Sequence, residues 1–224
     1  MRVLLFDIDG TLLNSGGAGQ AAMEAALEAA FGVTAQTEGI PVAGRTDRGI
    51  TADMMRFHGV EETSENRTRF EDAYLSLLPQ HIAERDGLIL PGVVELLDRL
   101  SRETSCMLGL LTGNLQRGAE AKLSHYQLLH HFCCGGYGDH HHDRDDVARE
   151  ALARACERLG RTQLNDVWVL GDTPADVKCG RAIGAKVIAV GTGHYSAAEL
   201  APTMPDFLFE DFSDVDAVLK TLMS

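Results

Sequence analysis

The sequence is short of positive charge. Its 224 residues carry 33 acidic against 20 basic side chains, a formal net charge of -13 at pH 7. Such a chain repels the phosphates of nucleic acids and the surface of anionic membranes, so we expect neither as a partner. Small phosphorylated ligands are not excluded, because a bound cation reverses the field inside a pocket.

Long apolar segments are also missing where a targeting signal would stand. The apolar stretch Val3–Phe6 is interrupted by Asp7 and is far shorter than the roughly 20 residues of a membrane span. We therefore expect a soluble, cytoplasmic protein.

Cysteine is sparse, and its pattern excludes a disulfide framework. The five cysteines are odd in number and show no Cys-x-x-Cys spacing. Cys133 and Cys134 are neighbours, which do not form an ordinary disulfide. We expect reduced and mostly buried thiols.

Short apolar runs that alternate with helical patterns are what the sequence does contain. Runs without polar alternation suit strands buried on both faces, so the pattern predicts an α/β fold with a doubly wound, mainly parallel sheet. The expected strands are Val3–Phe6, Met107–Leu111, Val167–Leu170, Val187–Val190 and Phe207–Phe209, and the expected helices are Val93–Leu100, Ala119–Leu129, Val147–Leu159 and Ala175–Ile183.

One interval departs from this alternation. About 80 residues separate the first strand from the helix near Val93, against roughly 2–6 in an ordinary connection. Helical patterns at Gly19–Phe31, Asp47–Phe57 and Ser64–Ile82 fall in this interval. They predict a small α-helical cap domain at residues 15–87, inserted into a core of residues 1–14 and 88–224. Its hinges would be Asn14–Gly17 and Asp86–Pro91.

Polar residues follow three of the expected strands. They are Asp7 and Asp9, then Thr112, Gly113 and Asn114, then Asp172 and Asp176. Because ligands of open α/β sheets bind at the carboxyl ends of the strands, we expect these side chains to meet. Two unit charges about 4 Å apart repel by roughly 4 kcal/mol at an effective dielectric of 20. Four gathered carboxylates therefore predict a hard divalent cation, Mg²⁺.

These motifs resemble those of the haloacid dehalogenase superfamily. The motifs are Asp7-Ile8-Asp9-Gly10-Thr11, the threonine at position 112, and Gly171-Asp172-Thr173-Pro174-Ala175-Asp176. The match is closest to phosphoglycolate-phosphatase-like and β-phosphoglucomutase-like members, which also carry a helical cap directly after the first motif. The resemblance implies a Rossmann-like core and a Mg²⁺-dependent phosphatase. Such an enzyme hydrolyses a small organic phosphomonoester through an aspartyl-phosphate.

The resemblance also implies roles for single residues. Asp7 would be the nucleophile, and Asp9 would protonate the leaving group and then deprotonate the attacking water. Thr112, with the backbone amides of Gly113 and Asn114, would hold the phosphoryl oxygens. Gly10 would allow a tight turn beneath the phosphate.

The implied metal ligands are carboxylates and one carbonyl. Asp7, the backbone carbonyl of Asp9 and Asp172 would hold Mg²⁺. Asp176 would be a further ligand or would support the ligands from behind.

The pattern departs from the family at one position. Most members carry a lysine, commonly Lys-Pro, just before the helix that precedes the last acidic motif. Here Arg144 stands at about that place and would clamp phosphate. Arg144 would equally suit pairing with neighbouring aspartates, and Lys122 is the other candidate cation.

Two further groups have alternative interpretations. His140–His142 suggest a transition-metal site, although a solvated loop at the rim of the site is favoured. Arg45 and Asp47 are placed to reach substrate from the cap, with Arg45 as a phosphate ligand, while Thr46 or Asp47 would equally cap the following helix.

Other functions on the same fold remain to be distinguished. A phosphomutase would use the same residues, and a catalytically inactive binding protein would share the fold. A dehalogenase has no use for Asp9, and phosphonate hydrolysis needs a cap lysine, whereas the first lysine of the chain is Lys122. The expected partner is a small phosphorylated metabolite, and the expected state is a monomer or homodimer.

Overall fold

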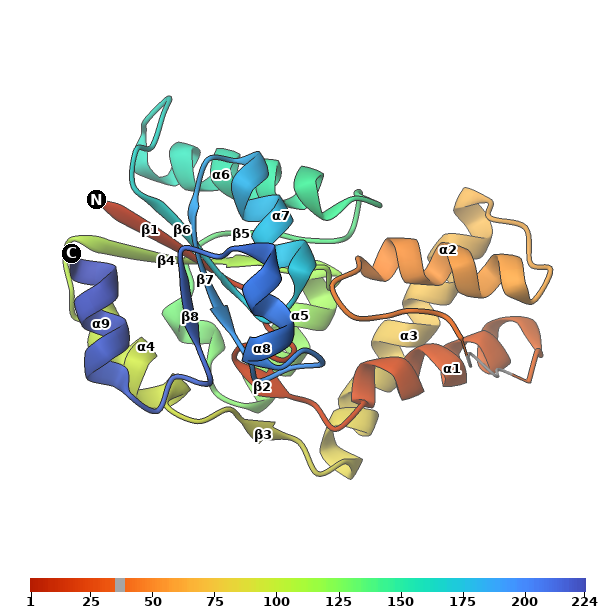
Figure 1. Cartoon of the computed structure of the whole chain (residues 1–224). Helices are drawn as coiled ribbons and strands as arrows, with labels where there is room; N and C mark the ends of the chain where they lie inside the picture. The colour runs from red at the N-terminus through yellow and green to blue at the C-terminus, as the bar shows by residue number, and fades with distance from the viewer. Residues whose placement is uncertain (35–38) are drawn as a thin grey trace.

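A six-stranded parallel sheet forms the centre of the computed structural model, which describes residues 1–34 and 39–224 (Figure 1). The strand order is β5-β4-β1-β6-β7-β8, and each neighbouring pair is parallel. The strands are β1 (Arg2–Phe6), β4 (Cys106–Leu111), β5 (Gly135–Gly136), β6 (Val167–Gly171), β7 (Lys186–Val190) and β8 (Phe207–Phe209). The predicted α/β fold with a doubly wound sheet is confirmed.

Helices cover both faces of this sheet, because alternate residues of a strand point to opposite sides. Leu4 and Phe6 pack into one apolar cluster, and Val3 and Leu5 pack into the other. The first cluster includes residues of α4 (Val93–Ser101), α5 (Gln116–His125) and α9 (Val215–Met223), and the second includes residues of α6 (Arg144–Leu159), α7 (Pro174–Ala182) and α8 (Ala197–Leu200).

A helical insertion lies beside the sheet, as Figure 1 shows. It consists of α1 (Ala18–Phe31), α2 (Asp47–Phe57) and α3 (Ser64–Glu84), close to the three predicted helices. Residues such as Leu27, Met54 and Phe70 give it an apolar core of its own. The insertion is confirmed, while the exact division at residues 15–87 stays a prediction.

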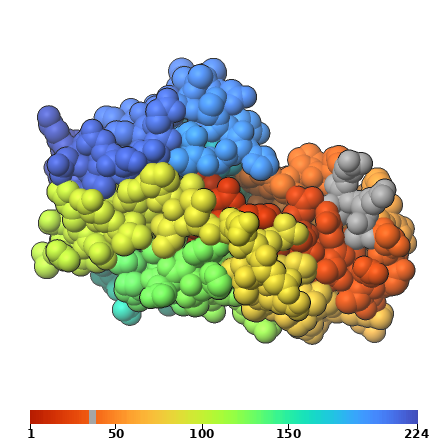
Figure 2. All heavy atoms as spheres, turned by 90° about the horizontal axis from the view of Figure 1, so that it is seen from below, coloured from red at the N-terminus to blue at the C-terminus, as the bar shows by residue number. Residues whose placement is uncertain are grey.

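The two connections to the insertion are paired with each other. Leu13–Asn14 (β2) and Leu88–Ile89 (β3) form a two-stranded antiparallel sheet. Figure 2 shows the segment around β3 running between the core and the helical insertion. The sequence suggested hinges here but gave no sign of this pairing, because each strand is only two residues long.

Two elements differ from their predicted bounds. Helix α5 begins at Gln116 and ends at His125, whereas the pattern suggested residues 119–129. It ends early because the backbone turns at Gln127, which has a φ of 58°. Strand β5 was not predicted, because its two residues are glycines. A Cβ on Gly136 would lie 2.3 Å from the carbonyl oxygen of Val147, so no side chain fits there.

The thiols are free but mostly not buried. Only Cys179 is buried, and Cys133 is exposed. The expectation of mostly buried thiols is therefore wrong, because three of the other four lie at partly exposed positions. No helix within residues 1–34 and 39–224 combines the length and apolarity needed to cross a membrane.

Candidate functional site

The predicted polar residues meet at the carboxyl ends of β1, β4 and β6. These three strands are adjacent at the centre of the sheet, with β1 between the other two. A cavity of about 270 Å³ opens there, lined both by the strand ends and by the helical insertion. Among its lining residues are Asp7, Asp172, Asp47 and Tyr74.

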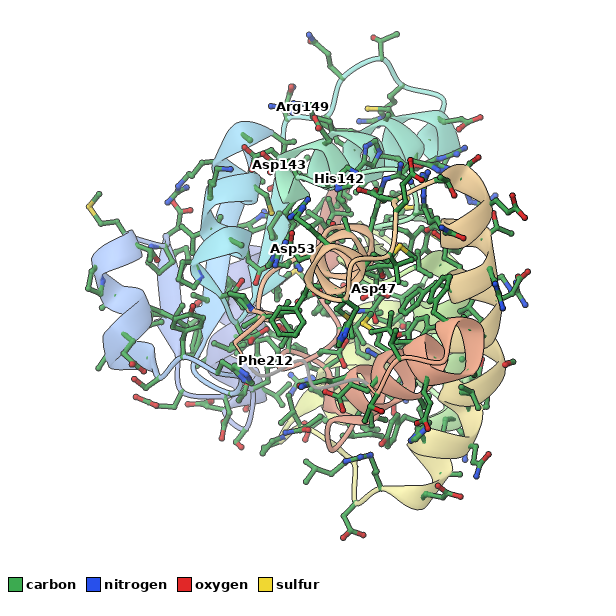
Figure 3. All side chains as sticks on the ribbon, turned by 90° about the vertical axis from the view of Figure 1, so that its right-hand side faces the viewer. Asp47, Asp53, His142, Asp143, Arg149 and Phe212 are labelled. Atoms are coloured by element: carbon green, nitrogen blue, oxygen red, sulfur yellow. The ribbon has the colours of Figure 1, made fainter. Side chains whose placement is uncertain are left out.

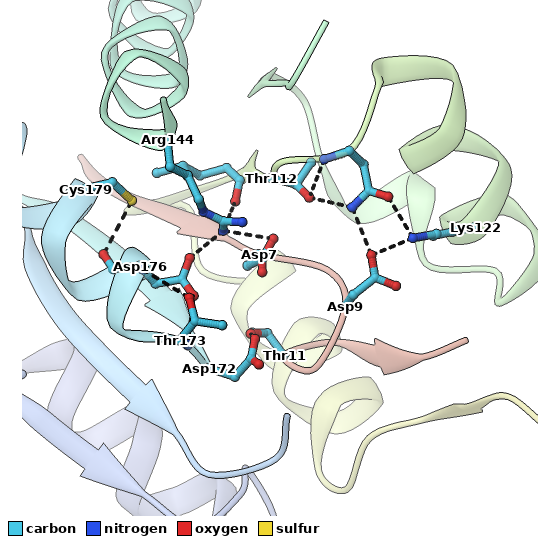
Figure 4. A network of polar contacts seen from close by, with 12 residues as sticks. Asp7, Asp9, Thr11, Thr112, Lys122, Arg144, Asp172, Thr173, Asp176 and Cys179 are labelled. Atoms are coloured by element: carbon cyan, nitrogen blue, oxygen red, sulfur yellow. Dashed lines mark hydrogen bonds and ion pairs between the residues drawn. The ribbon is translucent and has the colours of Figure 1, made fainter. Parts of the chain in front are cut away.

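Three carboxylates form a buried cluster at the bottom of this site (Figure 4). Single oxygens of Asp7, Asp172 and Asp176 lie within 4.8 Å of one another. Burial raises the pKa of Asp7 to about 6, and the nearby Asp176 charge adds to that rise. Burial, followed by the charges of Asp176 and Asp7, also raises the pKa of Asp172 well above its usual value. The three carboxylates therefore repel one another, and the Arg144 guanidinium only partly offsets the rise at Asp7.

The fourth carboxylate does not join this cluster, which corrects the expectation that all four would gather. Asp9 Oδ2 instead accepts hydrogen bonds from Lys122 Nζ at 2.5 Å and Asn114 Nδ2 at 2.9 Å. Ser15 Oγ donates to the other oxygen at 3.3 Å. Enclosure works to raise the pKa of Asp9, but the Lys122 ammonium and these hydrogen bonds outweigh it and hold the pKa below its usual value.

Arg144 supplies a cation to the buried cluster. It is the first residue of α6, whose N-cap is Asp143. Its Nη2 donates to Asp176 Oδ1 and lies 3.1 Å from Asp7 Oδ1. Arg144 therefore pairs with aspartates and also lies beside the expected nucleophile, so both alternatives from the sequence hold geometrically.

Asp176 is fully engaged by protein groups. Its Oδ2 accepts from the backbone amide of Thr173 at 2.9 Å and from the Thr173 hydroxyl at 2.7 Å, which caps α7. Its Oδ1 is taken by Arg144. Asp176 is therefore better placed to support metal ligands than to be one.

The groups expected around the phosphate lie beside the cluster. Thr112 is fully buried, and its hydroxyl accepts from Asn114 Nδ2 at 2.8 Å. Gly10 has a φ of 84°, and a Cβ there would lie 2.4 Å from Asp172 Oδ2. The carbonyl of Gly113 accepts from the backbone amide of Asp47 at 2.7 Å. The loop after β4 is thus tied to the helical insertion.

Thr46 fills the capping role, and Asp47 faces the cavity, while contact with substrate stays a prediction. The Thr46 hydroxyl caps α2 by accepting from the Gly49 amide at 3.1 Å. Asp47 lines the cavity and accepts from the backbone amide of Leu115 at 2.8 Å. Figure 3 shows Asp47 and Asp53 on α2, with His142 on the neighbouring core loop.

Arg45 lines the cavity, but its guanidinium bonds within the insertion. Nη2 contacts Asp53 Oδ2 at 2.7 Å and the carbonyl of Gly49 at 3.1 Å. Nη1 donates to the carbonyl of Pro41 at 3.1 Å. In this arrangement Arg45 does not join the carboxylate cluster, and phosphate binding by Arg45 stays a prediction.

The histidine run makes ordinary polar contacts. His141 Nε2 lies 3.1 Å from Glu150 Oε2, and Arg48 Nε donates to His142 Nε2 at 3.0 Å. In the part of the chain that the structure describes, the carboxylate cluster is the only group of three or more candidate metal ligands. These contacts favour the loop interpretation of His140–His142.

Sequence reasoning missed Tyr74 and assigned no partner to Lys122. Lys122 lies on α5 and Tyr74 on α3, far in sequence from the motifs. Both occupy ordinary helical positions, and Tyr74 reads as a core residue. No local signal distinguishes them, since only the packing of α3 and α5 brings them to the cavity.

The buried Asp47 makes folding stability depend on pH. Burial raises its pKa from 3.8 to about 6, with Lys122 opposing the rise. A carboxyl with a raised folded pKa stabilises the fold when protonated, and that stability is lost as pH rises through about 6. We expect the wild type to gain stability relative to Asp47→Asn as pH falls from 7 to 4.5, by on the order of 1–3 kcal/mol.

Melting temperatures of both proteins across this pH range measure the effect. The exposed substitution Asp72→Asn is the control and should leave the difference from wild type constant. A difference between wild type and Asp47→Asn that does not change with pH would contradict the raised pKa.

Comparison with known proteins connects this geometry to a family. A model of the haloacid dehalogenase-like hydrolases matches residues 1–184. No curated protein sequence is significantly similar to the chain.

Solved structures with the same fold cover nearly the whole chain. A predicted phosphoglycolate phosphatase from Haemophilus somnus is 18% identical with a TM-score of 0.73, covering 98% of both chains. CbbY from Rhodobacter sphaeroides, solved with phosphate, is 18% identical with a TM-score of 0.76, covering 96% of both. A candidate β-phosphoglucomutase from Thermotoga maritima is 19% identical with a TM-score of 0.62, covering 99% of both. At these identities the likeness shows the shared fold.

Proposed function

Because this chain belongs to the family of haloacid dehalogenase-like hydrolases, we propose that it is a Mg²⁺-dependent phosphatase. It would hydrolyse a small organic phosphomonoester through an aspartyl-phosphate on Asp7. One observation carries the proposal: buried Asp7 lies at the end of the central strand, beside Arg144 and among carboxylates that need a cation. The names of the structural relatives, which include a phosphatase and a phosphate complex, support the substrate class.

The buried cluster fits a hard cation. Among the described residues, buried Asp7 Oδ1 has an ion pair with Arg144 at 3.1 Å but no hydrogen bond. Burial is the main cause of the raised pKa values of Asp7 and Asp172, and repulsion from the neighbouring carboxylates adds to both rises. Asp7, Asp172 and the backbone carbonyl of Asp9 would hold Mg²⁺, and Asp176 would support them through Arg144. When bound, Mg²⁺ would neutralise the carboxylates and polarise a phosphoryl oxygen.

In the first half of the reaction, a carboxylate oxygen of Asp7 attacks phosphorus. The new oxygen–phosphorus bond forms as the bond to the leaving alkoxide breaks. Asp9 supplies a proton to that alkoxide. Because the pKa of Asp9 is held below its usual value, the proton starts on the Lys122 ammonium, 2.5 Å from Asp9 Oδ2, and would pass through Asp9 to the alkoxide. Arg144 and the Thr112 loop would hold the phosphoryl oxygens.

In the second half, water hydrolyses the aspartyl-phosphate. Asp9 takes a proton from water as the water oxygen bonds to phosphorus, and the Asp9–Lys122 pair thereby regains the proton that it gave to the alkoxide. The bond from phosphorus to Asp7 breaks, which releases phosphate and restores the Asp7 carboxylate. The low pKa of Asp9 beside Lys122 keeps this residue in the form that accepts the proton.

A screen of phosphorylated metabolites tests the function directly. Phosphate release is measured with Mg²⁺ and with EDTA, and chromatography of the organic product detects an isomerised sugar phosphate. Release that needs Mg²⁺ supports a phosphatase. Isomerisation without release would instead identify a phosphomutase, and no reaction with any compound would favour a binding protein.

Mg²⁺ should also stabilise the fold. A ligand at about 100 times its Kd adds about 2.7 kcal/mol, which corresponds to about 5–10 °C in a chain of this length. We expect Asp172→Asn to lose this stabilisation, because it removes one of the cluster's charges. Thermal melts with Mg²⁺ and with EDTA measure it, and Asp98→Asn on exposed α4 is the control. If the melting temperature of the wild type is the same with Mg²⁺ and with EDTA, the proposed metal site is wrong.

The helical insertion would act as a mobile cap of residues 15–87. It touches the core through hydrogen bonds at Gly113 and Leu115 and through apolar contacts of α3 with Leu115 and Ala121, and it contributes Tyr74 to the cavity. Its closure would exclude water from the aspartyl-phosphate and select the substrate. The segments Asn14–Gly17 and Asp86–Pro91 would be the hinges; the first begins at the end of β2, and the second contains β3.

A further inference from the structure

An unpaired hydroxyl from the helical insertion lies at the cavity. Tyr74 on α3 is fully buried and lines the cavity. Among the described residues, its hydroxyl makes no hydrogen bond. Leaving a buried polar group unpaired costs about 1–3 kcal/mol, which a phenylalanine of the same shape would avoid. The hydroxyl is therefore costly to the fold unless water or a ligand in the cavity pairs with it.

The position of this hydroxyl identifies the part of the cavity that it serves. A Cβ added to Gly19 would lie 3.9 Å from the Tyr74 hydroxyl and 3.4 Å from Lys122 Nζ. The two polar groups therefore face one space beside α1. Lys122 is bonded to Asp9, the proposed proton donor to the leaving group. This space is where the organic part of a substrate would lie.

The charges around this space disfavour an anionic organic group. Asp9 and Asp47 contribute two carboxylates, and Lys122 contributes one ammonium that is already bonded to Asp9 and Asn114. The Arg45 guanidinium also lines the cavity, but its charge is paired with Asp53. The charges of Asp47 and Asp9 also raise the pKa of the Tyr74 phenol, after burial as the main cause, so the phenol stays neutral and donates. A second carboxylate on the substrate would meet a net negative wall.

We propose that Tyr74 determines specificity by donating a hydrogen bond to a hydroxyl oxygen of the substrate. The substrate is a polyol phosphate whose organic part is uncharged, and not a phosphate ester that carries a carboxylate. This inference rests on the proposed phosphatase function and names the substrate class of the same site. Tyr74 would bind the organic group of the substrate, while Asp7 and Arg144 would act on its phosphate.

Three phosphomonoesters separate these possibilities. Glycerol 3-phosphate and 3-phosphoglycerate share a three-carbon skeleton and differ at one end, a hydroxymethyl against a carboxylate. Phenyl phosphate has no hydroxyl to bond. We expect wild-type kcat/KM to be at least about tenfold higher for glycerol 3-phosphate than for 3-phosphoglycerate, the effect of roughly one polar interaction.

The Tyr74→Phe variant tests the residue. We expect the ratio of kcat/KM for glycerol 3-phosphate over phenyl phosphate to fall about tenfold, the loss of one hydrogen bond. The matched control Tyr137→Phe removes a phenol outside the cavity lining and should leave the ratio unchanged. We also expect the melting temperature of Tyr74→Phe to equal or exceed that of wild type, because the lost hydroxyl has no hydrogen-bond partner among the described protein groups.

Each contrary result has a separate meaning. An unchanged ratio, or a preference for 3-phosphoglycerate, overturns this inference and leaves the phosphatase proposal standing. A clearly lower melting temperature of Tyr74→Phe would show a stabilising partner for the hydroxyl and would also overturn it. If none of the three esters nor any metabolite in the screen releases phosphate, the phosphatase function itself fails and the inference fails with it.

Discussion

Asp7→Asn is expected to lower phosphate release at least about a thousand-fold, because it removes the nucleophile and no neighbour replaces it. Asp9 is turned towards Lys122, and Asp176 is bonded to Thr173 and Arg144. The fold should survive, since an asparagine has the same shape and a neutral group relieves repulsion within the cluster. We expect the melting temperature in EDTA to be no lower than that of wild type.

Trapping of the phosphorylated state provides a second measurement. Beryllium fluoride with Mg²⁺ should form a mimic of the acyl-phosphate on wild-type Asp7, detectable by fluorine NMR, and should not do so on Asp7→Asn. Asp98→Asn, on an exposed face of α4, is the control for a generic charge change. Near-normal turnover by Asp7→Asn would show that Asp7 is not the nucleophile, even if Mg²⁺ still stabilises the protein.

The core of the fold could be predicted because its strands are buried on both faces. Val3–Phe6 and Val167–Leu170 read as unbroken apolar runs, and both became central strands. Strand β5 could not be predicted, since close packing against α6 leaves room only for glycine. The β2–β3 pair could not be predicted either, because strands of two residues show no periodicity in the sequence.

The candidate site likewise has residues that could be predicted from the sequence and residues that could not. Asp7 and Asp172 follow predicted strands, so the topology of a parallel sheet was enough to bring them together. The direction of Asp9 depends on Lys122, which arrives from a helix more than 100 residues later. Tyr74 arrives from the insertion. Contacts made by tertiary packing alone leave no mark on local sequence, and these are the contacts that would select the substrate.

Arg144→Ala is expected to lower kcat/KM by on the order of a hundred-fold or more. A phosphate dianion that approaches the Asp7 carboxylate is repelled, and Arg144 lies 3.1 Å from that carboxylate. The substitution also leaves Asp176 without its cation, and breaking a buried ion pair costs roughly 3–5 kcal/mol of stability. Rates must therefore be measured well below the melting temperature of the variant. Arg144→Lys, which keeps the charge but loses the planar fork, should recover stability more than activity.

The choice of leaving group separates Arg144 from Lys122. In the structure Lys122 bonds Asp9, the proposed proton donor, so Lys122→Met should also lower turnover when the leaving group needs a proton. With p-nitrophenyl phosphate, whose leaving group needs little protonation, Lys122→Met should lower kcat/KM less than it does with glycerol 3-phosphate. The loss caused by Arg144→Ala should persist, since every ester presents the same phosphate to Asp7. If Lys122→Met alone is severe with both esters, Lys122 holds the phosphate. If both variants are mild, neither residue does.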